Sequence, residues 1–137
     1  MVEGSGDAAV AGRIGPMPLR VGIDLVAAST VADALAAHGD RYLRRVYTEG
    51  EIADCVGDPL RLAARFAVKE AAMKVLRVGD AAVPLRSIET VRGSGGAPEL
   101  VLHGPAAELA AAAGLQTFAI SLTHEVAYAA AVVVAQA

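Results

Sequence analysis

The sequence predicts an α+β domain in which mainly antiparallel strands pack on one long central helix. The first observation is a helical stretch, residues 60–77, with apolar residues on two opposite sides, so that both sides have to be covered. The second is a series of alternating or β-branched segments after residue 84, separated by short turns that are typical of hairpins. At 137 residues the chain is long enough for one domain with a substantial core.

Composition narrows the classes of function. Hydrophobic residues make up 55% of the chain and charged residues 20%, which excludes global disorder and leaves unusually little polar surface. Burial between the subunits of an oligomer would account for this surplus. Aromatic residues make up 4%, Trp is absent and the net charge is -3, so we expect no nucleic acid partner.

The sequence also predicts a cytoplasmic protein. Cys55 is the single cysteine and cannot form an internal disulfide, which suits a reducing compartment. The N-terminus has no basic start followed by an apolar segment, and the longest apolar run, 126–135, is too short to span a bilayer. We therefore expect no targeting signal and no membrane partner.

The first strand contains one carboxylate. Residues 1–18 combine Gly, Ala and Pro without a strand or helix period and are predicted to be a flexible N-terminal extension, which leaves 19–137 as the domain. Residues 19–26 are apolar and β-branched, as in a buried strand. Asp24 lies in this strand or just past it. Alternatively, Asp24 caps a helix that begins at Leu25.

Short helices precede the central helix. Two segments of helical composition, 33–37 and 41–46, are separated by a break at 38–40, where a C-cap glycine is followed by a helix-starting aspartate. Residues 48–51, Thr-Glu-Gly-Glu, match a capping box that starts another short helix. A Gly-Asp-Pro turn at 57–59 then leads into the central helix.

The second half of the chain is mainly β. We expect a strand at 85–91 and its hairpin partner at 99–102. A proline and a glycine bracket an alanine-rich helix at 106–113. A half-buried strand at 118–123 and a more fully buried last strand at 128–135 complete the domain.

Charged residues interrupt the apolar sides of the central helix. At about 100° per residue, its apolar residues form two sectors on opposite sides: Leu62, Phe66, Met73 and Leu76, and Ala64, Val68, Ala71 and Val75. Lys69 lies inside the larger sector, while Glu70 and Lys74 lie about 40° apart at its border. Lys69 and Lys74 are also the only lysines of the chain. Charges in such positions need a partner or a ligand.

These charges suit a magnesium and polyphosphate site. Asp24 and Glu70 are carboxylates within apolar sequence, and two carboxylates with water and substrate phosphates commonly hold Mg²⁺. Arg65, Lys69 and Lys74 supply three cations within three turns. Two alternatives stay open. Glu70 and Lys74 can form an ordinary i,i+4 pair, and the cations can belong to a solvated face.

Other signals are weaker. His124 ends an alternating strand and is by itself more typical of a structural histidine than of a ligand or base. The glycine-rich run 93–96 lacks the Lys-Ser/Thr and the following helix of a Walker loop. The chain also has no metal-thiolate spacing and no Gly-x-Ser-x-Gly elbow, so nothing indicates a thiolate metal centre or a serine hydrolase.

Five blocks, in order and with the right approximate spacing, resemble the holo-[acyl-carrier-protein] synthase family. The resemblance covers about residues 20–135. The blocks are Val21-Gly22-Ile23-Asp24-Leu25-Val26, Tyr47-Thr48-Glu49-Gly50-Glu51, Ala63-Ala64-Arg65-Phe66-Ala67-Val68-Lys69-Glu70-Ala71, Gly96-Ala97-Pro98 and Ser121-Leu122-Thr123-His124. One block alone would be a weak signal, but five in register across one domain are specific.

This resemblance implies a 4'-phosphopantetheinyl transferase-like fold and a Mg²⁺-dependent reaction. The 4'-phosphopantetheine arm of coenzyme A would pass to a serine of an apo acyl carrier protein of fatty-acid or polyketide synthesis, with release of adenosine 3',5'-bisphosphate. The family's short members are homotrimers with active sites at subunit interfaces. The matched residues are Asp24 and Glu70 for Mg²⁺, Lys74 for the pyrophosphate, and Arg65, Lys69 and His124 for other contacts to the coenzyme A phosphates.

The physical reading of the residues suggests how they would act. Glu70, directly or through a water on the metal, is our candidate for the base that takes the proton of the serine. Lys74 would stabilise the leaving phosphate. The assignment of these two roles is a hypothesis.

Carrier proteins are acidic, so a basic docking surface is expected. Arg41, Arg44 and Arg45 share one helix face and could form it, although the same face can be an ordinary solvated one. The family usually has Arg or Lys in the helix just after the aspartate, whereas this chain has none at 27–31.

Two rival functions remain at this stage. One is a coenzyme A or nucleotide-binding module without transferase activity, and the other is a structural trimer whose charged helix serves assembly. The joint presence of Asp24, Glu70 and Lys74 argues against both rivals, because neither needs a metal pair together with a phosphate lysine.

Overall fold

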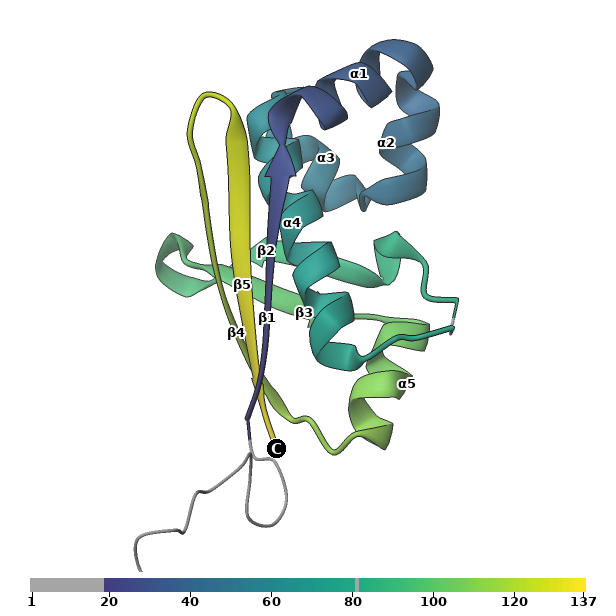
Figure 1. Cartoon of the computed structure of the whole chain (residues 1–137), viewed down its shortest axis with the longest axis vertical. Helices are drawn as coiled ribbons and strands as arrows, with labels where there is room; N and C mark the ends of the chain where they lie inside the picture. The colour runs from purple at the N-terminus through teal and green to yellow at the C-terminus, as the bar shows by residue number, and fades with distance from the viewer. Residues whose placement is uncertain (1–18, 81) are drawn as a thin grey trace, which may run out of the picture.

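The α+β class predicted from the sequence is confirmed by a computed structural model, which describes residues 19–80 and 82–137 (Figure 1). The extension predicted at 1–18 lies outside the described residues. In chain order the elements are β1 (Leu19–Ala27), α1 (Ala28–His38), α2 (Asp40–Val46), α3 (Glu49–Cys55), α4 (Pro59–Leu76), β2 (Ile88–Arg92), β3 (Pro98–Leu102), α5 (Gly104–Ala112), β4 (Thr117–His124) and β5 (Tyr128–Gln136), with short 3-10 turns at Leu85–Ser87 and Ser94–Gly96.

Two antiparallel sheets frame the central helix. One has three strands in the order β1-β5-β4, and the other is the β2-β3 hairpin. A short turn joins β4 to β5, and the first and last strands of the domain pair along their whole length, so that Asp24 lies opposite Ala131. The alternation of side chains along β1 therefore decides which of its residues meet the central helix.

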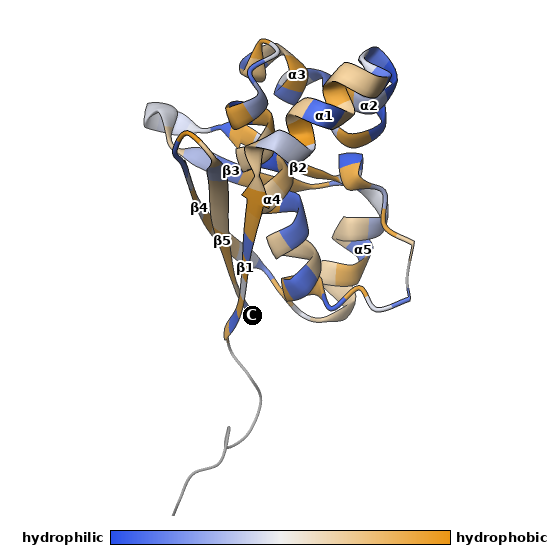
Figure 2. Ribbon diagram, turned by 45° about the horizontal axis from the view of Figure 1, so that its top comes forward, coloured by the Kyte–Doolittle hydropathy of each residue, from blue (hydrophilic) through white to orange (hydrophobic). Residues whose placement is uncertain are grey.

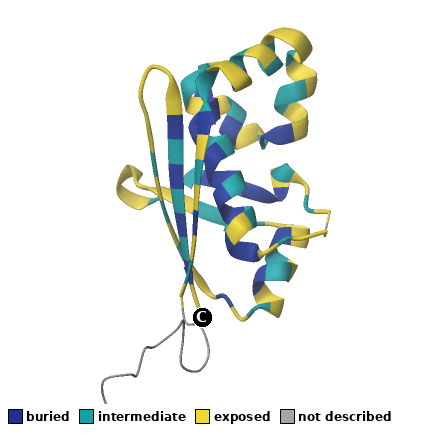
Figure 3. Ribbon diagram, in the orientation of Figure 1, coloured by how far each residue is buried: buried dark blue, intermediate teal, exposed yellow. Residues whose placement is uncertain are grey.

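Helix α4 is covered on two sides, as its sequence predicts. It contacts β1, β5 and β4 on one side and α1, α3 and β2 elsewhere (Figure 1). Ten of its residues are buried, which Figure 3 shows as dark blue along the ribbon. The Asp58 carboxylate caps its start by accepting a hydrogen bond from Leu60 N–H at 2.9 Å. The helix ends where Arg77 turns into the left-handed region, with φ of 54°.

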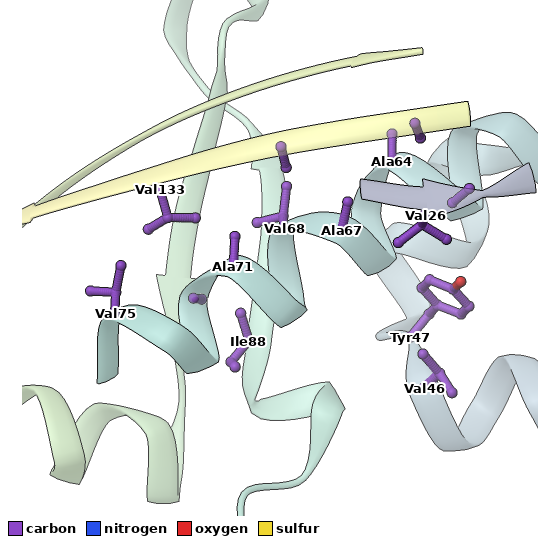
Figure 4. Packing of buried hydrophobic residues seen from close by; sticks show 14 of the residues in the cluster. Val26, Val46, Tyr47, Ala64, Ala67, Val68, Ala71, Val75, Ile88 and Val133 are labelled. Carbon is purple, nitrogen blue, oxygen red and sulfur yellow. The ribbon is translucent and has the colours of Figure 1, made fainter. Parts of the chain in front are cut away.

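The hydrophobic core lies where α4 meets the sheet and the short helices. Val68 and Val75 point toward Val133 of β5, and Ile88 of β2 lies on another side of the helix (Figure 4). Small alanines along α4 let the strands approach closely. The hydroxyl of the fully buried Tyr47 donates to a main-chain carbonyl of α4, so its polar end is satisfied.

Two local predictions have clear outcomes. The capping box is confirmed, because the Thr48 hydroxyl accepts from Glu51 N–H and the Glu51 carboxylate accepts from Thr48 N–H. The helix cap considered for Asp24 is wrong. Asp24 is paired within β1, and α1 begins after Ala27 without a side-chain cap.

The two faces of β1 differ in what covers them. Alternate residues, among them Gly22 and Asp24, face α4. The others point away from it, are 49 to 66% exposed and are all apolar: Leu19, Val21, Ile23 and Leu25 (Figure 2). An apolar strip of this length is unusual on a monomer surface and indicates a contact surface. Within the described residues, no helix is both long enough and apolar enough to cross a membrane.

Candidate active site

Gly22 brings β1 into direct contact with the central helix. A Cβ atom at this position would collide with the carbonyl oxygen of Ala71 and lie 3.0 Å from Cγ2 of Val75. Glycine is therefore needed for the close approach of strand and helix. Asp24 follows two residues later on the same side of β1, which places its carboxylate beside α4.

Asp24 meets Lys74 at this crossing. Lys74 Nζ lies 3.3 Å from Asp24 Oδ1 and donates to the carbonyl of Ile23 at 2.7 Å. The Lys74 side chain is 56% exposed and that of Asp24 is 20% exposed, so both remain accessible to a ligand. An ion pair this exposed contributes little to folding, about 0 to 1 kcal/mol.

Glu70 completes a cluster with Asp24 and Lys74. Partial burial raises the pKa of Glu70, the Asp24 carboxylate raises it further, and Lys74 partly offsets these effects. The two carboxylates therefore lie close enough to repel each other. Among the residues that the structure describes, no group of three or more acidic, histidine or cysteine side chains could hold a metal ion.

Lys69 requires a correction. The sequence predicted a contact between this lysine and a coenzyme A phosphate, but its side chain is fully buried. Its ammonium donates to Glu51 Oε1 at 2.7 Å and to the carbonyls of Leu85 and Ile88. Burial lowers the pKa of Lys69 and the Glu51 carboxylate opposes that shift. All three ammonium protons of Lys69 are donated within the chain, and the side chain has no exposed surface. Lys69 is therefore a structural residue that connects α4 with α3 and with the segment that leads into β2.

Arg65 and His124 line a separate hollow of about 340 Å³. Arg65 Nη2 lies 3.9 Å from the Asp54 carboxylate, and His124 ends β4. The other lining residues come from α3, α4, β2, the turn after β2, β3 and β4: Asp54, Arg61, Ala64, Thr90, Val91, Arg92, Gly96, Pro98 and Leu122. Three arginines and a histidine thus surround one hollow, an arrangement that suits an anion.

Two of these arginines were missed by the sequence analysis. Arg61 lies one turn before Arg65 on the same side of α4, a spacing that could have indicated it. Arg92 ends β2, and nothing in its local sequence distinguishes it.

The carboxylate cluster and the hollow lie on different sides of α4. Arg65 and Glu70 are five positions apart, which is about 140° around the helix and about 7.5 Å along it. Glu70 is directed toward β1 and Arg65 toward α3 and β2. Within one chain, the structure brings together Asp24, Glu70 and Lys74, and separately Arg65 and His124.

The arginines predicted to dock a carrier protein, Arg41, Arg44 and Arg45, are all exposed on α2. Arg41 and Arg45 border a hollow with His38 and Tyr42. Arg44 borders another hollow that also contains Glu49. Arg41 and Arg45 therefore share one hollow.

Comparisons with known proteins agree with the resemblance noted in the sequence. A family model described as the 4'-phosphopantetheinyl transferase superfamily matches residues 20–133. A holo-[acyl-carrier-protein] synthase from Koribacter versatilis is 40% identical over 122 residues, covering 86% of this chain and 98% of that protein. One from Carboxydothermus hydrogenoformans is 43% identical over 107 residues, covering 76% and 86%.

Solved structures show the same fold. The Helicobacter pylori holo-[acyl-carrier-protein] synthase in complex with coenzyme A has a TM-score of 0.77 at 27% identity, covering 85% of this chain and 100% of that one. The Mycobacterium tuberculosis acyl carrier protein synthase has a TM-score of 0.66 at 36% identity, covering 85% and 96%. With the family model matched over most of the chain, the chain belongs to the holo-[acyl-carrier-protein] synthases of the 4'-phosphopantetheinyl transferase superfamily.

Proposed function

We propose that this transferase moves the 4'-phosphopantetheine arm of coenzyme A to a serine of an apo acyl carrier protein, with Asp24 and Glu70 as the protein ligands of a magnesium ion. Family membership supports the reaction, and the Helicobacter pylori relative was solved with coenzyme A. The observation that carries the residue assignment is the meeting of Asp24, Glu70 and Lys74 where Gly22 lets β1 touch α4.

The carboxylate pair fits magnesium. In proteins, Mg²⁺ keeps several bound waters and takes one or two carboxylates together with substrate phosphates. Asp24 and Glu70 would therefore be enough protein ligands for it. Burial raises the pKa of Glu70 and the Asp24 carboxylate raises it further; a divalent ion between the two carboxylates would remove their mutual repulsion. When bound, Mg²⁺ would supply charge neutralisation at the pyrophosphate.

The chain's own residues account for the proton and the leaving group. The serine oxygen forms a bond to the phosphorus that carries the pantetheine arm, the pyrophosphate bond at that phosphorus breaks, and adenosine 3',5'-bisphosphate leaves. Glu70 takes the serine proton as the general base. Lys74 lies one turn away and donates to the oxygens of the leaving phosphate.

Arg65 and His124 are proposed to bind the phosphates of coenzyme A in the hollow that they line. One coenzyme A molecule reaches this hollow and a carboxylate cluster at the same time if two copies of the chain contribute, since the two sites lie on different sides of α4. A homotrimer would provide this arrangement. The uncovered apolar face of β1 supports such an assembly.

The carrier protein is proposed to dock beside α2. Arg41 and Arg45 present two exposed cations one turn apart, which complements the acidic surface of a carrier protein of fatty-acid or polyketide synthesis. We expect the reaction to take place in the cytoplasm, in keeping with the single, buried Cys55.

The direct test is intact-mass spectrometry of an apo carrier protein after incubation with the full chain, coenzyme A and Mg²⁺. We expect the carrier to gain the mass of one phosphopantetheine group and adenosine 3',5'-bisphosphate to appear in equal amount. Calorimetric binding of coenzyme A without any mass gain on several carriers would favour the binding module instead.

A further inference from the structure

We propose that Asp33 on α1 is a specificity-determining residue, which selects a carrier protein that is uncharged or basic opposite Asp33 and acidic where it reaches Arg41 and Arg45 on α2. This inference deepens the proposed function and rests on it, because it takes an apo carrier protein as the partner.

Helix α1 lies between the carboxylate cluster and the arginines of α2. It follows β1, the strand of Asp24, without a break, and one glycine separates it from α2 (Figure 1). Its 11 residues span about 16 Å. A carrier protein that brings its serine to Asp24 while its acidic surface reaches Arg41 and Arg45 therefore lies across α1.

The outward side of α1 has no lysine or arginine. The helix turns Val31, which is buried, and Leu35, which is partly buried, toward the core. Its exposed residues are small or polar: Ser29, Thr30, Asp33, Ala36, Ala37 and His38. Asp33 is the one carboxylate among them, so it is the acidic group that a partner on α1 meets.

Asp33 has no evident role in stabilising the helix. It is the sixth residue of α1, beyond the first turn in which a carboxylate favours the helix dipole. The residues four positions before and after it are Ser29 and Ala37, so it has no i,i+4 ion pair. Across residues 19–80 and 82–137, no salt bridge involves Asp33. Its exposed carboxylate can therefore act on a partner at no cost to the fold.

The exposed charges of α2 have the opposite sign, because Arg41, Arg44 and Arg45 outnumber Asp40. The surface formed by the two helices is therefore divided into an acidic part on α1 and a basic part on α2. A carrier carboxylate opposite Asp33 would be repelled, whereas one opposite the arginines would be attracted. Such a division discriminates between carriers by where their acidic residues lie, as well as by how many they have.

The test is steady-state transfer to an apo carrier protein that is acidic on both sides of its serine. At low salt, Asp33→Ala should lower the KM for this carrier about two- to fivefold, as expected for the removal of one like charge across a hydrated interface, and Asp33→Arg should lower it further. The kcat should not change, because Asp33 does not touch the reacting groups. The gain should shrink at about 0.5 M salt, where the charges are screened.

Glu108→Ala is the matched control. It changes the net charge of the chain by the same amount, at an exposed residue of α5, which lies at the opposite end of the molecule from α1 and α2 (Figure 1). This variant should have the KM of the wild type. An unchanged or higher KM in both Asp33 variants overturns the proposal, and so does an equal fall in Glu108→Ala, which would reflect net charge alone.

Carrier variants in which single carboxylates near the serine are replaced by amides locate the contact. At one position, the amide should lower the KM for the wild-type enzyme and have little effect on the KM for Asp33→Ala. Independent effects of the enzyme and carrier substitutions at every position would overturn a direct contact.

The same assays separate this inference from the proposed function. The proposed function fails if the wild type adds no phosphopantetheine to any carrier. The inference about Asp33 fails if the wild type transfers normally and the Asp33 variants keep its KM.

Discussion

At the scale of single residues, the two lysines of α4 have opposite environments. Helical periodicity correctly placed Lys69 inside an apolar sector, but it could not show which segment covers that sector. The partner is Glu51, 18 positions away on α3, so the burial of Lys69 depends on tertiary packing. Asp24 and Glu70 could be singled out from sequence because carboxylates in apolar surroundings need a cation or donors.

Replacing Lys69 should destabilise the fold. Lys69→Met leaves the Glu51 carboxylate buried without its cation, and removing one member of a buried pair typically costs about 3 to 5 kcal/mol. Urea unfolding of the ligand-free protein measures the change in the free energy of unfolding.

Lys74→Met is the matched control on the same helix. The Lys74 side chain is 56% exposed, so this variant should lose less than about 1 kcal/mol of stability while losing transfer activity. A stable Lys69→Met variant with weakened coenzyme A binding would contradict the structural role of Lys69.

Glu70→Gln should abolish transfer without harming the fold. The folded-state pKa of Glu70 is raised, so its charged form opposes folding at neutral pH, and the neutral amide should leave the melting temperature unchanged or higher. Loss of a general base lowers the rate by about 10²- to 10⁴-fold. Carrier modification followed by mass spectrometry gives the rate, and near-normal transfer would remove Glu70 from the mechanism.

At the scale of elements, the chain's local signals located most helices and strands. The capping box at Thr48 and the ends of α4 follow from short-range hydrogen bonds that the sequence encodes directly. The strand predicted from residue 85 begins later, at Ile88, because Ser87 first closes a turn on the Pro84 carbonyl. The contact of Gly22 with α4 joins remote segments, and no local pattern could predict it.

Helix α2 contains the two arginines proposed to dock the carrier protein. If Arg41 and Arg45 attract an acidic carrier protein, raising the salt concentration from low to about 0.5 M should increase the KM for the carrier, because screening shortens the range of these charges. Steady-state kinetics at several salt concentrations measure this dependence.

The double variant Arg41→Ala, Arg45→Ala should have a higher KM at low salt and a weaker salt dependence. Arg86→Ala, at an exposed arginine before β2, is the control and should behave like the wild type. A salt-independent KM for the wild type would indicate apolar docking.

At the scale of the whole molecule, the apolar composition and the outward face of β1 indicate association. If β1 contributes to a homotrimer, Val21→Glu should yield monomers in size-exclusion chromatography with light scattering, because the interface would bury an unpaired charge. Val56→Glu is the matched control, since Val56 is 74% exposed and lies after α3. A monomeric wild type would contradict the trimer.

The magnesium site proposed at Asp24 and Glu70 depends on all three scales, because Gly22 lets β1 cross α4 there and the bound substrate would complete the site. A crystal structure of the full chain with coenzyme A and Mn²⁺, which serves as an anomalous substitute for Mg²⁺, tests it most directly. We expect one anomalous peak with a carboxylate oxygen of Asp24 and one of Glu70 both as ligands, at about 2.0 to 2.3 Å. An ion that binds coenzyme A phosphates without either carboxylate, or with only one of the two, would contradict the shared site.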